Sequence, residues 1–75
     1  MTSAEVLGKR IEHLRKSKGW SQLDLSIESE VNKNYICDLE NGRRNPSLEI
    51  LERIANALNI TLEELFKGVQ TIPGI

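Results

Sequence analysis

The sequence predicts an all-α domain built from five helices. Apolar residues recur at the three- and four-residue spacing of amphipathic helices along nearly the whole chain. Each apolar stretch follows a residue that commonly caps a helix N-terminus, and most end at a glycine or asparagine. A chain of 75 residues has room for one domain. We expect this domain to span residues 1–68 and a short tail to span residues 69–75.

The first helix is predicted to begin after Thr2. Thr2 and Glu5 have the spacing of a capping box, in which each side chain bonds the other residue's backbone N–H. Gly19 is expected to end the helix in the left-handed conformation. The apolar stripe that faces the core consists of Leu7, Ile11 and Leu14.

The second and third helices are predicted to be short and to be separated by a tight turn. Ser21 caps the second helix, which runs to about Ser29. Trp20, just before it, is expected to pack on the helix as a hydrophobic staple. Asn32 caps the third helix, which runs to Asn41 and is stopped by Gly42.

The fourth and fifth helices follow a loop that contains Pro46. Ser47 caps the fourth helix and Asn59 closes it. Thr61 and Glu64 have capping-box spacing at the start of the fifth helix, which ends before Gly68. The inward residues expected for the fourth helix are Leu48, Leu51, Ile54, Ala55 and Leu58.

The formal net charge of −1 argues at first sight against a nucleic-acid partner. The charges, however, are unevenly distributed. Residues 9–18 carry five basic side chains and one acidic side chain, Glu12, and Arg43 with Arg44 form a second basic pair. We interpret the first stretch mainly as a solvated helix face and the arginine pair as a functional group.

Several classes of function are disfavoured by the residue inventory. A single cysteine, Cys37, and a single histidine, His13, give neither a disulfide nor a metal site. No set of nucleophile and base and no phosphate-binding loop is present, so we expect no enzyme, no cofactor and no small-molecule ligand. Without a long apolar run we expect no membrane partner and a cytoplasmic location. Cys37 is interpreted as a small filler on an exposed helix face, and His13 as a surface residue.

The third helix is predicted to have one apolar and one polar side. Ile36, Leu39 and Glu40 share one side, and the opposite side carries Asn34, Cys37, Asp38 and Asn41. Two short helices joined by a tight turn, the second with an exposed polar face, match the unit that enters the major groove of DNA. This pattern indicates a DNA-reading helix.

Residues 21–25, 31–36 and 39–48 together resemble the Cro and phage-repressor type of helix-turn-helix, also called the xenobiotic-response-element family. The likeness covers about residues 6–67. It implies a five-helix domain like that of lambda repressor, with the second and third helices as the helix-turn-helix. It also implies a bacterial or phage transcriptional regulator, a repressor or autoregulator, that binds an inverted repeat as a homodimer. Regulators of phages, plasmids, toxin–antitoxin pairs and restriction–modification operons all fit this description.

The resemblance also implies roles for individual residues. The positions that reach base edges match Asn32, Lys33, Asn34 and Asp38. The positions that contact the DNA backbone match Gln22, Tyr35, Asn41, Arg43 and Arg44. Arg15 and Glu40 match a structural ion pair. By side-chain chemistry, Lys33 suits guanine, Asn34 suits adenine, and Asp38 suits the amino group of cytosine.

Two residues depart from the family pattern, which usually has alanine at Ser26 and glycine at Glu30. Serine is small enough for close helix contact. A left-handed glutamate costs roughly 1–2 kcal/mol, so we expect the turn to follow a slightly different path. Asp38 lies near the expected phosphates, where it would penalise DNA sites that offer it no hydrogen-bond donor.

The C-terminal part of the chain is more apolar than a small five-helix core requires. We expect this surface to form a homodimer interface, and the alternative is that it packs back on its own chain. The residues concerned are Leu62, Phe66, Val69, Ile72 and Ile75. The rival function is a protein-interaction module that keeps the helix-turn-helix scaffold without binding DNA.

Overall fold

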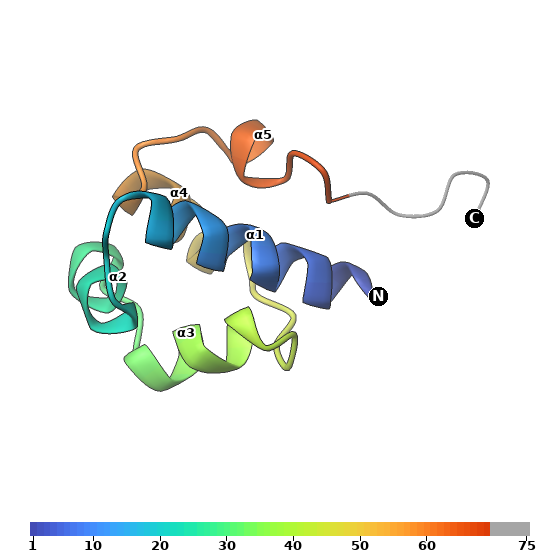
Figure 1. Ribbon diagram of the computed structural model, residues 1–75, viewed down its shortest axis with the longest axis horizontal. Coiled ribbons are helices and arrows are strands. Elements are labelled where there is room, and N and C mark those ends of the chain that lie inside the picture. The colour runs from blue at the N-terminus through green and yellow to red at the C-terminus, as the bar shows by residue number, and fades with distance from the viewer. Residues whose placement is uncertain (70–75) are drawn as a thin grey trace.

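The computed structural model describes residues 1–69, and this part of the chain is all-helical, as predicted (Figure 1). The helices are α1 (Ser3–Ser17), α2 (Gln22–Ser29), α3 (Lys33–Glu40), α4 (Leu48–Ala57) and α5 (Leu62–Leu65). Ile72 and Ile75 lie outside the described residues, as does most of the predicted tail.

Every helix begins at the predicted cap. In each case the side-chain oxygen of the cap accepts a backbone N–H of the first turn, over 2.7–3.2 Å. Each of these bonds satisfies a donor that has no partner within the helix. The caps are Thr2, Ser21, Asn32, Ser47 and Thr61.

The capping box predicted at α5 is only half formed. The backbone N–H of Glu64 donates to Thr61 Oγ1 over 3.1 Å. The Glu64 carboxylate instead lies 3.6 Å from Arg10 Nη2, which also donates to the Glu64 carbonyl over 2.9 Å. Glu64 therefore links α5 to α1, because a cation from a distant part of the chain competes with the local backbone donor.

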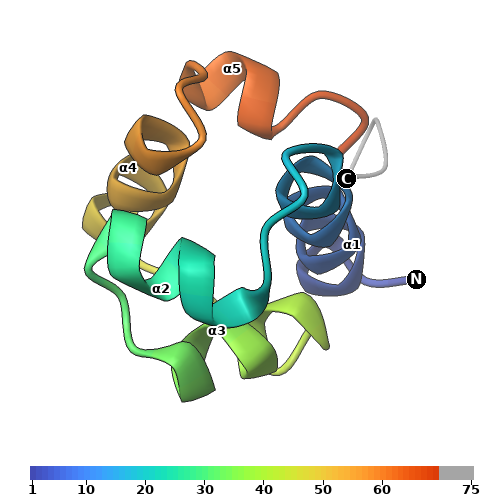
Figure 2. The same cartoon turned by 60° about the vertical axis from the view of Figure 1, so that its left-hand side comes forward.

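The five helices surround one core. α1 packs against α3 and α5, α2 packs against α3 and α4, and α4 packs against α5 (Figure 2). The buried apolar side chains are Leu7, Ile11, Leu25, Val31, Ile36, Leu39, Leu51, Ile54, Ala55, Leu58 and Leu65. Leu14 and Trp20 are partly buried against this cluster. Since all five helices contribute to it, the angle of α3 depends on the whole domain.

The prediction that Leu48 faces the core is wrong. Its side chain is 63% exposed, whereas the other four inward residues predicted for α4 are buried. Leu48 is the first residue of α4. It therefore lies at the N-terminal end of the apolar stripe of α4, beyond the part of the helix that packs on the core.

The expected alternative path for the turn between α2 and α3 is also wrong. Glu30 adopts the left-handed conformation, with φ 58° and ψ 33°. Three hydrogen bonds hold this turn and offset the strain. Ser26 Oγ donates to the Val31 carbonyl over 2.7 Å, the Val31 N–H donates to Ser29 Oγ over 3.3 Å, and Arg53 donates to the Glu30 carbonyl over 3.2 Å.

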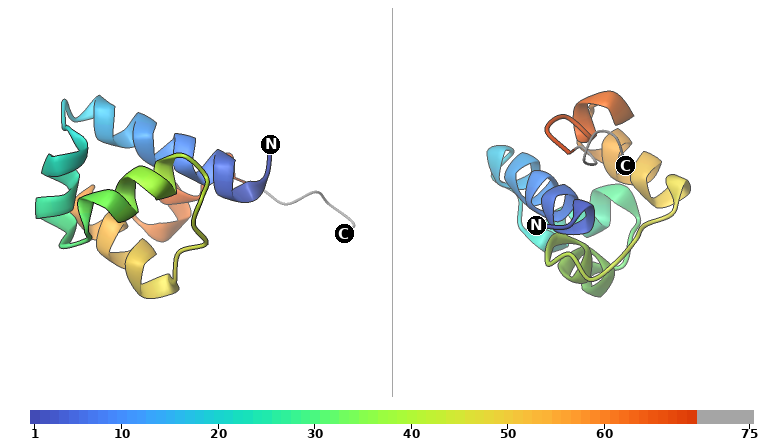
Figure 3. Two further views of the ribbon diagram at one scale, coloured as in Figure 1. Left: turned by 90° about the horizontal axis from the view of Figure 1, so that it is seen from below. Right: turned by 90° about the vertical axis from the view of Figure 1, so that its right-hand side faces the viewer.

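α1 and α3 lie side by side (Figure 3), and Gly8 of α1, a residue that the sequence pattern did not single out, lies directly against the end of α3. A Cβ atom at this position would lie 2.7 Å from the carbonyl oxygen of Glu40 and would also meet that of Leu39. Real Cβ atoms do not approach so closely. The absence of a side chain at Gly8 therefore sets the spacing between α1 and the last turn of α3.

Candidate nucleic-acid interface

α3 lies at one edge of the molecule and has the predicted two-sided character (Figure 1). Its inner side, Ile36, Leu39 and Glu40, is buried. Its first turn is exposed at Lys33 and Asn34. The polar side is thus available to a partner and is not sealed within the domain.

Asn32 caps α3 and is itself exposed. Its Oδ1 atom accepts the N–H of Asn34 over 2.7 Å. This bond fixes the direction in which the chain enters the helix. It therefore fixes the backbone positions from which the side chains of Lys33 and Asn34 project. The partial positive charge of a helix N-terminus lies at the same point.

The predicted base-contacting Asp38 and two predicted backbone-contacting arginines lie together. Asp38 Oδ1 is 3.9 Å from Arg43 Nη1, and Asp38 Oδ2 is 3.7 Å from Arg44 Nε. The Arg43 N–H donates to the Asp38 carbonyl over 2.9 Å, which folds the loop back onto α3. The Arg44 guanidinium lies over the ring of Tyr35, 4.9 Å from its centroid.

Sequence reasoning missed this cluster. Gly42, with φ 74°, reverses the chain after the helix, so residues five and six positions beyond Asp38 return to it. The sequence did carry a signal for this cluster: an acidic residue lies one turn before a glycine that ends the helix, and two arginines follow that glycine directly.

Asn41 is exposed at the end of α3, and its side chain is engaged locally. Its Nδ2 atom donates to the Cys37 carbonyl over 2.8 Å and lies 3.7 Å from Cys37 Sγ. His13 is exposed, as expected. Cys37, expected on an exposed helix face, is partly buried.

The predicted structural pair of Arg15 and Glu40 is present and buried. Arg15 Nε and Nη2 donate to the two carboxylate oxygens over 2.7 and 2.9 Å, and the side chains are 8% and 3% exposed. The hydrogen bond to Glu40 raises the pKa of Arg15 above its ordinary value. Arg15 Nη1 also donates to the Trp20 carbonyl over 2.8 Å. The pair therefore joins α1, the start of the helix-turn-helix and α3.

Gln22, predicted to contact the DNA backbone, belongs to the same network. Its Nε2 atom donates to Glu40 Oε1 over 3.1 Å. A primary amide has two N–H groups, so the second remains for another acceptor. Contact of Gln22 with phosphate stays a prediction, and its position relative to α3 is set by Glu40.

The described part of the predicted dimer surface packs partly on its own chain. Leu62, Phe66 and Val69 are half-buried against the core. Phe66 and Val69 also line an apolar hollow with Leu7 and Leu51. Both expectations for these residues therefore retain support, because they contact the core and still leave apolar surface uncovered.

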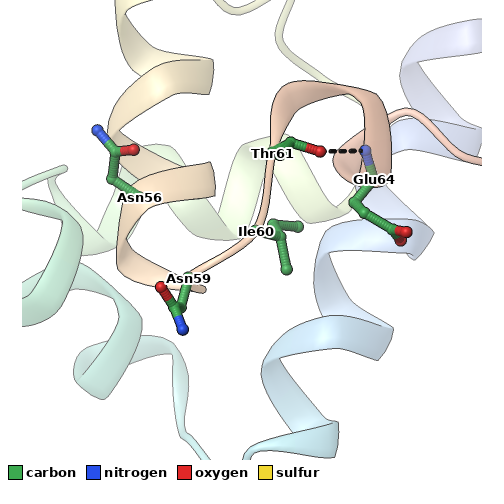
Figure 4. A pocket seen from close by; sticks show the side chains of 5 residues that line it. All are labelled: Asn56, Asn59, Ile60, Thr61 and Glu64. Carbon is green, nitrogen blue, oxygen red and sulfur yellow. Dashed lines mark hydrogen bonds between the residues drawn. The ribbon is translucent and has the colours of Figure 1, made fainter.

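A second hollow, between the end of α4 and α5, is lined by Asn56, Asn59, Ile60, Thr61 and Glu64 (Figure 4). Glu64 is its one ionisable side chain and already lies near Arg10. Residues 1–69 contain no group of three or more His, Cys, Asp or Glu side chains able to hold a metal ion. Within the same residues, no helix has the length and apolarity that a membrane span needs.

The fold and the exposed start of α3 define a helix-turn-helix domain like that of lambda repressor. The chain belongs to the helix-turn-helix family, whose model matches residues 11–65. Among curated relatives, it is 38% identical over 64 residues to the HTH-type transcriptional regulator DdrOP3 of Deinococcus deserti, covering 85% of this chain and 50% of the relative. It is 39% identical to the control protein C.MunI of a Mycoplasma species, covering 84% of this chain and 86% of that protein.

Solved structures agree with the sequence comparisons. The restriction-modification controller protein C.AhdI from Aeromonas hydrophila superposes with a TM-score of 0.82 at 38% identity, covering 84% of this chain and 96% of that structure. The chain spans half the length of the DdrOP3 regulator and most of the length of the two control proteins. The family is one of DNA-binding regulators and not of enzymes.

Proposed function

We propose that this protein is a sequence-specific transcriptional regulator that inserts the start of α3 into the major groove of duplex DNA. One observation carries the proposal: Asn32, Lys33 and Asn34 are exposed at the leading end of a helix whose opposite side is buried. A groove about 12 Å wide admits one α-helix. The relatives named as regulators and controllers support the same function.

The proposed contacts divide into two kinds. Lys33 and Asn34 read guanine and adenine at the leading end of α3, and Asp38, one turn later, accepts from the cytosine amino group. Arg43 and Arg44 follow α3 at its other end and contact phosphates. Gln22 of α2, Tyr35 of α3 and Asn41 contact phosphates as well. The first set gives sequence preference, and the second gives affinity that depends on salt.

The proposal includes a homodimer on an inverted repeat. The apolar hollow that Phe66 and Val69 share with Leu7 supports this, since a second copy would cover it. Two-fold symmetry then predicts half-sites about 34 Å apart. A repressor or autoregulator in the cytoplasm of a bacterial cell fits these features. Sedimentation that shows only monomers well above micromolar concentration would rule the dimer out.

The function is tested in two steps. Bound duplexes are first selected in vitro from a random pool, and their affinities are then measured at several salt concentrations. Wild-type protein should enrich an inverted repeat. Arg43→Ala and Arg44→Ala should each weaken binding on every sequence and reduce the salt slope, by up to about 0.9. Asn34→Ala should relax preference at one base position by about 1–3 kcal/mol.

Lys67→Ala is the matched control, because it removes an exposed positive charge next to α5, on the far side of the molecule from α3 (Figure 2). It should leave affinity and salt slope close to those of the wild type. Unchanged duplex binding in the three interface variants would remove the proposed mechanism. Failure of the wild type to bind any duplex would favour the protein-interaction module instead.

A further inference from the structure

Asp38 has an unusual position for a residue at a surface that must approach phosphates. It is the one carboxylate within reach of Arg43 and Arg44 among the ion pairs of residues 1–69, and it lies near both of them. The Asp38 side chain is 35% exposed, and those of Arg43 and Arg44 are 71% and 51% exposed. Each carboxylate oxygen faces a different arginine, so one negative charge lies between two positive charges and neutralises only one of them.

We propose that Asp38 is a built-in competitor for the DNA backbone: it holds Arg43 and Arg44 in the unbound protein and exchanges them for phosphates when α3 docks. This proposal rests on the proposed DNA-binding function and deepens it. It assigns Asp38 a role in selectivity that does not require a base contact alone, because the carboxylate weakens binding to every duplex that offers it no hydrogen-bond donor.

The geometry suits an exchange and not a permanent bond. Distances of 3.7 and 3.9 Å exceed those of a good charge-assisted hydrogen bond, about 2.7–2.9 Å. Exposed ion pairs of this kind are weak and are further screened by salt. A phosphate can therefore displace the carboxylate from either arginine with little resistance.

The cluster also restricts where the arginines lie before DNA arrives. Arg44 lies close to two groups of α3, with its guanidinium 4.9 Å from the centroid of the Tyr35 ring and its Nε 3.7 Å from Asp38 Oδ2. The backbone bond from the Arg43 N–H to the Asp38 carbonyl keeps the loop against the end of α3. In the unbound protein the two arginines therefore already lie close to α3, the helix proposed to read the bases.

The exchange has a consequence for Asp38. Once its arginines contact phosphates, the carboxylate is left beside the DNA without a cation. A cytosine amino group in the groove supplies a new donor, whereas a base edge that presents only acceptors, such as that of guanine, leaves the charge unpaired and repelled. The same side chain therefore lowers affinity for random DNA and raises the discrimination between sites.

Asp38→Asn is the test, because asparagine keeps the size of the side chain and removes its charge. Affinity is measured for a random-sequence duplex and for the selected duplex, at several salt concentrations. We expect the variant to bind random duplex about threefold to tenfold more tightly, since a repulsive charge is gone. The salt slope should steepen by up to about 0.9, because one negative charge that offsets the two arginines is gone. The ratio of selected to random affinity should fall.

Glu63→Gln is the matched control, since it removes the same charge from an exposed position on α5. Thermal melting and sedimentation of both variants check that folding and oligomeric state are preserved. The proposal is overturned if Asp38→Asn and Glu63→Gln give the same random-duplex affinity and slope, or if Asp38→Asn weakens binding to both duplexes. Failure of the proposed function appears differently, as absence of duplex binding by the wild type.

Discussion

Two sets of arginine–carboxylate contacts lie at opposite sides of the same short helix and differ in almost every physical respect. Arg15 and Glu40 are buried, 8% and 3% exposed, and meet through two hydrogen bonds of 2.7 and 2.9 Å. Asp38 lies 3.7–3.9 Å from Arg43 and Arg44, in solvent. Burial makes the first set a fixed part of the scaffold, and exposure leaves the second free to exchange partners.

The difference shows how one helix serves two purposes. Glu40 anchors the inner side of α3 to α1 through Arg15 and to α2 through Gln22. Its partners cannot be replaced by water without leaving a buried charge unpaired. The outer side of α3 carries charges that water and phosphate can reach. Rigidity on one side allows an adjustable contact on the other.

The largest effect is expected from breaking the buried pair. Arg15→Ala leaves the Glu40 carboxylate buried without its cation and should lower the free energy of unfolding by about 3–5 kcal/mol. Arg43→Ala also removes an arginine side chain, but from the exposed set, and should change the free energy of unfolding by less than about 0.5 kcal/mol. Urea unfolding followed by circular dichroism measures both.

The double variant Arg15→Met, Glu40→Leu sharpens this result. Replacing both charges with apolar side chains of similar size leaves no buried charge unpaired. The Trp20 carbonyl and the Gln22 amide each lose a partner, so the variant should recover much, and not all, of the stability lost in Arg15→Ala. Equal losses in Arg15→Ala and Arg43→Ala would mean that burial does not distinguish the two sets.

A smaller loss is expected at Gly8, which holds the buried side of α3 close to α1. In Gly8→Ala the new methyl group meets the carbonyl oxygens of Leu39 and Glu40, so the helices must separate. We expect the free energy of unfolding to fall by about 1–3 kcal/mol.

Lys9→Ala is the control, since it makes an alanine one position further along, on the exposed side of α1. It should stay within about 0.5 kcal/mol of the wild type in urea unfolding. Helix propensity alone predicts that alanine at Gly8 stabilises the protein. A gain in stability would therefore show that the close approach of α1 and α3 is unimportant.

The smallest effect concerns Glu5, an exposed carboxylate in the first turn of α1. Glu5 accepts the Thr2 N–H over 2.9 Å, and the hydrogen bonds with Thr2 lower the pKa of Glu5 from its ordinary value of 4.5. Because the folded pKa lies below the unfolded one, the stabilisation is present above the unfolded pKa. It is lost as the pH falls through the folded pKa.

Glu5→Gln keeps an oxygen acceptor and cannot titrate. We expect the small difference in melting temperature between wild type and Glu5→Gln to shrink as the pH falls below 4.5. Melting curves recorded from pH 7 to pH 3 measure it. A difference that is constant over this range would show that the charged form of Glu5 has no special role.

Local signals sufficed for most of the fold. Short-range chemistry fixes the caps at Thr2, Ser21 and Ser47, because each accepts the backbone N–H of the residue three positions further along. The same signals misjudged Leu48 and Glu30. The exposure of Leu48 depends on where α4 begins relative to the core, and the turn at Glu30 depends on Arg53 from another helix. The resemblance to a known family supplied the pairing of Arg15 with Glu40, which local patterns do not reveal.

The sequence by itself determined the number of helices, their caps and the polar face of α3, since these follow from residue spacing within one or two turns. The tertiary structure alone decided that Gly8 sets the spacing of α1 and α3, that Gln22 bonds Glu40, and that Asp38 lies between Arg43 and Arg44. These contacts join segments whose separation depends on packing and on the turn at Gly42, and distances of that kind are not encoded in any local pattern.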